Sequence, residues 1–174
     1  MKKKALVFGL VGVVAVGAAA FVFASAGTPE KDHKSEDLKK LRGTEAYYAD
    51  QKTEVANDIG GELVANLAGG SFVKLKLDVE YRPGMEWEKT LHDLAAAGKG
   101  DPKAGPAGAY FAEKNSKVRS ALILTLGRKS VEQLQGANLL LFKEELVRMI
   151  NDLLFPDKVA RVEDVYFKDW VIQK

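Results

Sequence analysis

The amino-acid sequence predicts an α+β protein with a single N-terminal transmembrane helix, followed by one domain with an antiparallel or mixed sheet and packed helices. Three observations predict it. Residues 5–26 carry no charge, residues 72–81 alternate between apolar and charged side chains, and residues 138–154 place apolar side chains at helical spacing. A half-buried strand and an amphipathic helix in one chain indicate a sheet packed against helices.

The uncharged N-terminal run is long enough to cross a membrane. As a helix with about 1.5 Å rise per residue it would be about 33 Å long, and the hydrocarbon core of a bilayer is about 30 Å thick. Met1-Lys2-Lys3-Lys4 precedes it, and these positive charges predict a cytoplasmic tail at residues 1–4. The predicted anchor at residues 5–26 includes Ala5, Phe8, Gly12, Val16, Phe21 and Ala26.

The same run has a second interpretation as a cleaved secretory signal peptide. Ala24-Ser25-Ala26 has the A-x-A form that a signal peptidase cuts, and cleavage after Ala26 would release a soluble exported binding protein. The apolar core of a signal peptide is typically about 7–15 residues long, and this run is longer. Its length favours an uncleaved anchor, with the bulk of the chain outside the cytoplasmic membrane.

The composition limits the classes of function. The chain has 174 residues with 26 Lys and Arg against 24 Asp and Glu, and three of the lysines lie in the N-terminal tail. The exported part is therefore close to neutral, without the basic surface that nucleic-acid binding requires. The absence of cysteine excludes disulfides and thiolate metal sites. The length predicts one domain after the membrane helix.

Residues 27–58 are predicted to form a linker. Thr28–Gly43 is polar and charged without a sustained apolar period, and Thr44–Asp58 is only weakly helical. A hairpin is predicted next, because Leu63–Leu67 and Phe72–Tyr81 are separated by a turn containing two glycines. The charged alternates of the second strand favour a sheet face exposed to solvent.

The segment Gly84–Asn115 is the least regular part of the sequence. A helix is predicted over Glu86–Ala97, because Trp87, Leu91 and Leu94 lie at i, i+4 and i+7. The sequence GKGDPKAGPAG that follows predicts a flexible loop, so residues 84–115 are interpreted as a flexible insertion. Its glycines match neither a phosphate-binding loop nor a dinucleotide fingerprint.

After this segment the helical signals become strong. Ser116 is expected to cap a helix that Gly127 ends, although the stretch ALILTL is equally compatible with a buried strand. Ser130–Gln133 fits a capping box at the start of a short helix. A longer amphipathic helix is expected from Asn138, and Pro156 is expected to end it.

The last element is a long strand predicted over Val159–Gln173. It is rich in β-branched and aromatic residues, with apolar side chains on both alternates from Val165 to Ile172. Such a pattern fits a strand that is covered on both sides or one that is kinked by a bulge.

The types and spacing of the potentially catalytic residues favour a partner-binding protein over an enzyme. The sequence contains no cysteine, only two histidines far apart, and no G-x-S-x-G motif, so a nucleophile and base pair is not evident. We therefore expect no catalytic residue, cofactor, metal ion or small-molecule substrate. Tyr166, Phe167 and Trp170 are either anchors for a partner or fillers of the domain core, and the burial usual for aromatic residues favours the core.

Three stretches resemble one known family. VRSALILTLGRKSVEQLQGANLLLFKEELVRMINDLL followed by VEDVYFKDWVIQ resembles the C-terminal half of the flagellar basal-body protein FliL, and LVANLAGGSFVKLKLDVEY resembles an earlier strand segment of that family. The resemblance implies a stomatin-like (SPFH-like) periplasmic domain at residues 59–174 and a location in the cell inner membrane at the basal body of the flagellum. Asn151 and Gln173 match the family motif, which implies that they satisfy backbone groups or contact a neighbouring subunit.

The resemblance also implies a function. Members of the family are expected to form a homo-oligomeric ring around the stator units MotA and MotB of the flagellar motor and to support torque generation. A stomatin-like membrane-organising protein without a role in motility is the alternative, because a fold does not fix a function.

Overall fold

The computed structural model describes residues 30–98 and 105–173, and side chains from residue 36 onward. Its elements in chain order are α1 (Glu30–Leu41), α2 (Glu45–Tyr48), β1 (Glu54–Ala56), β2 (Leu63–Asn66), β3 (Phe72–Pro83), α3 (Trp87–Ala96), α4 (Gly105–Leu126), the 3₁₀ helix η1 (Glu132–Leu134), α5 (Asn138–Leu154) and β4 (Ala160–Gln173). The predicted α+β class is confirmed. The stomatin-like likeness stays a prediction.

The described sheet is organised around the long strand β3. Strands β1 and β2 both pair with β3, and β4 pairs with it as well, with every pairing antiparallel. In register, Leu63 lies opposite Leu75, and Val79 lies opposite Val165. The sheet is therefore antiparallel rather than mixed, and the predicted hairpin of the second and third strands is confirmed.

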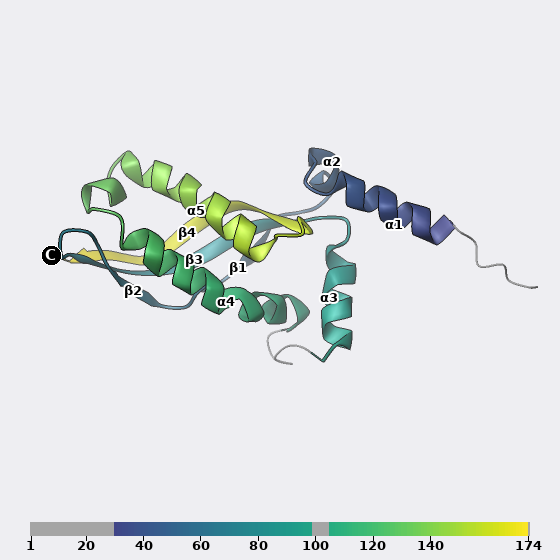
Figure 1. Cartoon of the computed structure of the whole chain (residues 1–174), viewed down its shortest axis with the longest axis horizontal. Coiled ribbons are helices and arrows are strands. Elements are labelled where there is room, and N and C mark those ends of the chain that lie inside the picture. The colour runs from purple at the N-terminus through teal and green to yellow at the C-terminus, as the bar shows by residue number, and fades with distance from the viewer. Residues whose placement is uncertain (1–29, 99–104, 174) are drawn as a thin grey trace, which may run out of the picture.

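The two faces of the sheet differ in chemistry. Helices α4 and α5 lie over one face (Figure 1), and the side chains of β3 on that face are fully buried. These are Val73, Leu75, Leu77, Val79 and Tyr81. The charged alternates of β3 lie on the other face, which carries no helix in Figure 1. The prediction of one apolar and one solvated face is confirmed.

Two irregularities let β4 place most of its apolar residues on the helix side. The register with β3 shifts beside Glu163 and again beside Asp169, whose φ is +51°. Each shift inserts an extra residue into β4, which reverses the alternation of side chains between the faces. Phe167 before the second bulge and Trp170 after it therefore both pack against the core. A bulge explains the apolar residues on both alternates.

Helix α4 begins earlier than the sequence predicted. Ser116 lies inside it rather than at its start, and the Ser120 hydroxyl donates to the Ser116 carbonyl one turn away. The stretch ALILTL is helical, so the strand alternative is wrong, and the helix ends at Leu126 before Gly127. The capping box is partly formed, because the Gln133 side-chain oxygen accepts the Ser130 backbone N–H at 2.9 Å.

The interpretation of residues 84–115 as an irregular insertion is corrected by the described part of that segment. Helix α3 confirms one of its predicted elements, and residues 105–115 are the first half of α4. Tyr110 and Phe111 of this half contact Trp87, with ring centroids 5.0 and 6.3 Å apart. These aromatic contacts with the core hold a Gly- and Ala-rich sequence in helical form. Residues 99–104 lie outside the described residues.

Part of the predicted linker is also regular. Residues 30–41 form α1, which projects from the body of the domain in Figure 1, and β1 already pairs with β3. The predicted membrane helix at residues 5–26 lies outside the described residues. None of the helices that the structure describes combines the length and apolar character needed to cross a membrane.

Candidate partner-binding surface and N-terminal clasp

Strand β4 carries the aromatic residues that the sequence singled out, and it places them on two faces. Phe167 and Trp170 lie on the helix side, with ring centroids 4.5 Å apart, and both rings contact Phe142 of α5. Both are partly buried and pack against the hydrophobic core. This position fits the core-filling interpretation of the two residues.

Tyr166 lies on the opposite, open face of the sheet. Its side chain is 43% exposed, and its hydroxyl donates to the Glu80 carboxylate on β3. That hydrogen bond raises the pKa of Tyr166 to about 12, because ionisation would bring two negative charges together. The Lys143 ammonium lies 5.1 Å from the ring centroid. Tyr166 is thus an exposed aromatic side chain held in a fixed position.

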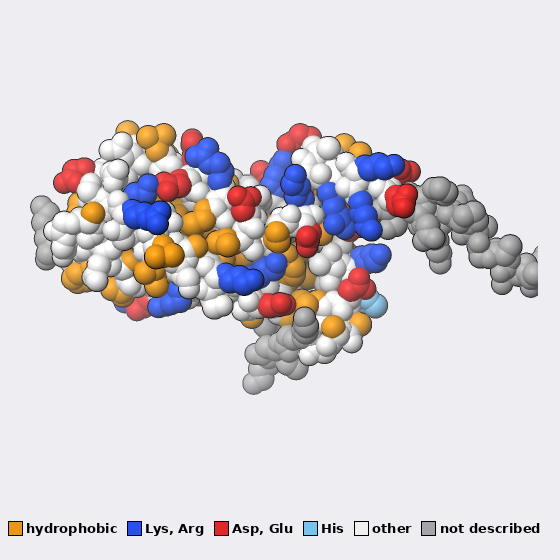
Figure 2. All heavy atoms as spheres, in the orientation of Figure 1, with side chains coloured by type: hydrophobic (Ala, Val, Ile, Leu, Met, Phe, Trp, Pro, Cys, Tyr) orange, Lys and Arg blue, Asp and Glu red, His pale blue; other side chains and the backbone are white. Residues whose placement is uncertain are grey.

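The open face around Tyr166 is a grid of opposite charges. Ion pairs join Lys74 to Glu62 at 3.0 Å and Lys168 to Asp78 at 2.6 Å. Asp78 is buried and also accepts the Asp58 backbone N–H at 2.9 Å. On the side of the molecule that carries the helices, Figure 2 likewise shows acidic and basic side chains interspersed, as the near-neutral composition predicts. This face offers polar, shape-defined contacts rather than a field of one sign.

The remaining two predicted residues lie elsewhere along β4. The Asn151 side-chain oxygen accepts the Val162 backbone N–H at 3.0 Å, so Asn151 satisfies a backbone group of its own chain. Gln173 is exposed at the far end of the strand, opposite Phe72. The five predicted contact residues therefore do not form one continuous surface, and their binding of a partner stays a prediction.

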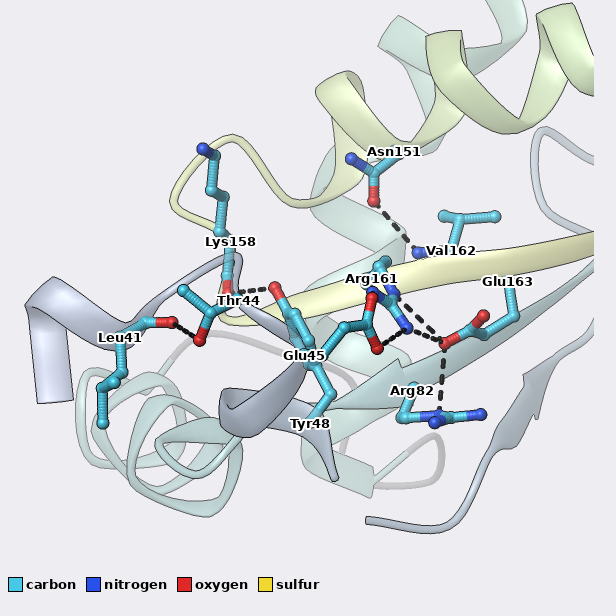
Figure 3. A network of polar contacts seen from close by, with 10 residues as sticks. All are labelled: Leu41, Thr44, Glu45, Tyr48, Arg82, Asn151, Lys158, Arg161, Val162 and Glu163. Atoms are coloured by element: carbon cyan, nitrogen blue, oxygen red, sulfur yellow. Dashed lines mark hydrogen bonds and ion pairs between the residues drawn. The ribbon is translucent and has the colours of Figure 1, made fainter. Parts of the chain in front are cut away.

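A second constellation, which the sequence did not reveal, joins α2 to the domain. Arg161 of β4 donates to both carboxylate oxygens of Glu45, at 2.5 and 3.3 Å, and to Glu163 at 2.9 Å (Figure 3). Its guanidinium lies 4.8 Å from the ring centroid of Tyr48. These carboxylates raise the pKa of Arg161 above its ordinary value. A bidentate pair of this kind fixes direction as well as distance.

A matching contact lies at the start of α3. Arg42 Nε donates to the Glu86 carboxylate at 2.5 Å, and the Tyr47 hydroxyl donates to the same oxygen at 3.1 Å. The hydrogen bond from Arg42 lowers the pKa of Glu86, whose side chain is only 9% exposed. Burial raises the pKa of Tyr47 to about 12.

The two tyrosines of α2 are completely enclosed. Tyr47 is 0% and Tyr48 is 1% exposed, and their rings meet edge to face at 5.1 Å. The Tyr48 hydroxyl donates to the Lys158 carbonyl at 2.8 Å, and the Tyr47 ring lies against Gly84, where a Cβ atom would be 2.0 Å away. We call this cluster the clasp; it consists of Arg42, Glu45, Tyr47 and Tyr48 together with their partners Gly84, Glu86, Lys158 and Arg161.

The sequence did not predict the clasp, because the residues that contact one another in it are far apart in the chain. The Glu45 and Arg161 pair spans 116 positions, and no periodicity connects such residues. One signal was present. Two adjacent tyrosines in a charged stretch that was expected to be solvated indicate local burial, because large aromatic side chains are seldom left in water without a reason.

Neither constellation resembles a reaction centre. Within the described residues, no group of three or more His, Asp and Glu side chains is placed to hold a metal ion. A surface hollow of about 420 Å³ between α5 and β4 is lined by apolar side chains and by charges of both signs, among them Lys143, Arg148 and Asp164. The fold is a small antiparallel α+β domain. Its two distinctive features are the open face of the sheet around Tyr166 and the clasp that joins α2 to the rest of the domain.

Comparison with known families identifies the group to which this domain belongs. The model of the family described as flagellar basal body-associated protein FliL matches residues 56–173, which include strands β2 to β4 and helices α3 to α5 but only the last residue of β1. The chain belongs to the FliL family, and it is thus a flagellar basal body-associated protein. A search of curated proteins finds no match. The resemblance noted from the sequence is confirmed.

Proposed function

We propose that this protein is a non-enzymatic, single-pass protein of the cell inner membrane that associates with the stator units MotA and MotB and supports torque generation. Its N-terminus lies in the cytoplasm and its domain in the periplasm. The observation that carries the proposal is the family match over residues 56–173, which follows directly on a predicted anchor and linker. An anchor concentrates the domain beside partners in the same membrane, where weak contacts suffice.

The described domain supports this proposal through its surfaces. The open face of the sheet presents Tyr166 among fixed ion pairs, which suits a partner of complementary shape and alternating charge. Several copies arranged as a homo-oligomeric ring around a stator unit would repeat this face. The domain would then act by packing against the stator rather than by chemistry.

Co-purification from detergent-solubilised membranes tests the proposal. The protein is tagged after Lys174, and recovery of MotA and MotB with it is expected. A Val14→Arg variant places a charge in the predicted span, which is costly at the centre of a bilayer, and it is expected to lose the stator proteins.

One result would contradict the proposal. If the tagged protein is soluble, begins at Gly27 and brings down no stator protein, it is an exported binding protein that was cleaved after Ala26. Normal swimming of a deletion strain with assembled flagella would instead favour a membrane-organising protein outside motility.

A further inference from the structure

The segment that joins α1 and α2 to the domain is held by side chains alone. Within the described residues, the backbone hydrogen bonds of residues 42–53 close locally, for example from Tyr47 to Thr44 at 3.1 Å and from Gln51 to Tyr48 at 3.1 Å. Backbone pairing with the sheet begins only at β1. The segment can therefore leave the domain without breaking a strand pairing.

The tyrosines of the clasp are buried apart from the main core. The principal hydrophobic cluster begins at Ala56 and does not include Tyr47 or Tyr48, although both are enclosed. The match to the family model likewise begins at residue 56. The core of the domain is thus complete without α1 and α2, which form a small satellite with its own contacts.

The charged contacts of the clasp lie where solvent can reach them. The Glu45 side chain is 82% exposed, and that of Arg161 is 27% exposed, so salt screens their attraction. Arg42, whose side chain is 26% exposed, pairs with the more enclosed Glu86. Two ion pairs and two tyrosine side chains are a limited set of contacts for holding a segment of this length.

From these observations we propose that residues 30–48 form a latch, which opens as one unit at the clasp while the sheet and α3 to α5 stay folded. The biological role of the latch depends on the proposed membrane anchor, because α1 lies in the sequence between that anchor and the domain. When it is closed, α1 is a helix about 18 Å long. When it is open with α1 and α2 still helical, residues 27–52 can span at most roughly 57 Å. The latch thus sets how far the domain reaches from the membrane.

A distance measurement on the full-length protein in phospholipid nanodiscs tests the latch. The chain has no cysteine, so Lys39→Cys on α1 and Arg148→Cys on α5 give two unique spin-label sites at exposed positions. A narrow short distance is expected from the closed latch, with a minor longer and broader population from the open one. Adding Arg42→Gln and Glu45→Gln is expected to increase the long-distance population at least fivefold, as is high salt.

A matched variant and a stability measurement make the result decisive. Glu144→Gln removes an exposed carboxylate on α5 outside the clasp and is expected to leave the distances unchanged. The thermal midpoint of the domain is expected to change by less than about 3 °C in the clasp variant, because the core is separate. The proposal is overturned if the distances do not respond to the clasp variant, or if the long distance appears only as the domain unfolds. Retention of the protein in the nanodiscs reports on the anchor separately, so failure of the proposed function is distinguishable from failure of the latch.

Discussion

The side-chain oxygen of Asn151, near the end of α5, accepts the backbone N–H of Val162 at the start of β4, at 3.0 Å (Figure 3). The bond spans the turn at Pro156 and fixes the angle at which the last strand leaves the last helix. Both ends of the turn are tied, since the Phe155 N–H also bonds the Asn151 carbonyl at 2.8 Å. Asn151 therefore links the end of α5 to the start of β4.

Asn151→Ala is expected to lower the free energy of unfolding by about 1–2 kcal/mol, because it leaves the Val162 N–H without its acceptor. Urea denaturation of the full chain in detergent measures the change. Asp152→Ala, at the exposed neighbouring position, is the control and should cost less than about 0.5 kcal/mol. Equal losses at both positions would contradict the role given to the asparagine.

The aromatic residues of β4 should separate into structural and partner-binding roles. Trp170→Ala is expected to cost about 2–4 kcal/mol of stability, since its ring packs against Phe142 and Phe167. Tyr166→Ala should cost less than about 1 kcal/mol because its ring lies on the open face. Under the proposed function it should reduce the recovery of stator proteins in co-purification. Unchanged recovery would remove Tyr166 from the binding surface.

The bulge at Asp169 makes a prediction about backbone conformation. With φ at +51°, Asp169→Gly should stay within about 1 kcal/mol of the original stability, whereas Asp169→Val should lose about 1–3 kcal/mol because β-branched residues resist positive φ. Thermal unfolding of the two variants compares them. Gln173→Val, at an exposed position of the same strand, should be tolerated, and a large loss there would show that valine itself is the problem.

The close approach of Tyr47 to Gly84 predicts a non-additive pair of substitutions. Gly84→Ala should lower stability by about 1–3 kcal/mol, because the new methyl group would overlap the tyrosine ring. In a Tyr47→Ala background the same change should cost less than about 0.5 kcal/mol, since the obstacle is gone. A double-mutant cycle by chemical denaturation measures the coupling, and simple additivity would contradict the packing described.

The ion pair of Glu86 predicts a dependence on pH. Its hydrogen bond from Arg42 lowers the pKa in the folded protein below the ordinary value of 4.5, so its stabilising contribution is fully present at pH 7. The contribution is lost as the pH falls from about 4.5 through the folded pKa. Unfolding measured from pH 7 to pH 3 should show a flatter profile for Glu86→Gln than for the unaltered protein. Parallel profiles would exclude Glu86 as a contributor.

Local patterns predicted the elements whose cause is local. The alternation of residues 72–81 correctly predicted β3, and the apolar stripe of α5 correctly predicted the last helix. In both elements one face is buried, and this burial sets the spacing of the apolar residues. Apolar residues on both alternates of β4 indicated a bulge, which the register shifts confirm.

Features with distant causes were missed. Residues 105–115 are helical because Tyr110 and Phe111 are anchored in the core, and the glycines and prolines nearby obscured this. The hydrogen bonds of the clasp join residues 39 to 116 positions apart, so only three-dimensional packing brings them together. Of the predicted contact residues, the sequence identified the strand that carries most of them but not the face on which each lies.

The two bulges of β4 have a consequence for behaviour at high local concentration. Among the described strands, β4 pairs with β3 alone, so its other edge has no strand partner. The bulges leave only Asp164–Lys168 as a regular stretch between them, and the charged residues Glu163 and Asp169 flank it. A long, flat edge would template edge-to-edge aggregation between neighbouring copies, whereas a kinked and charged one resists it. In the ring of copies proposed above, this edge would keep neighbouring domains from joining through an intermolecular β-sheet.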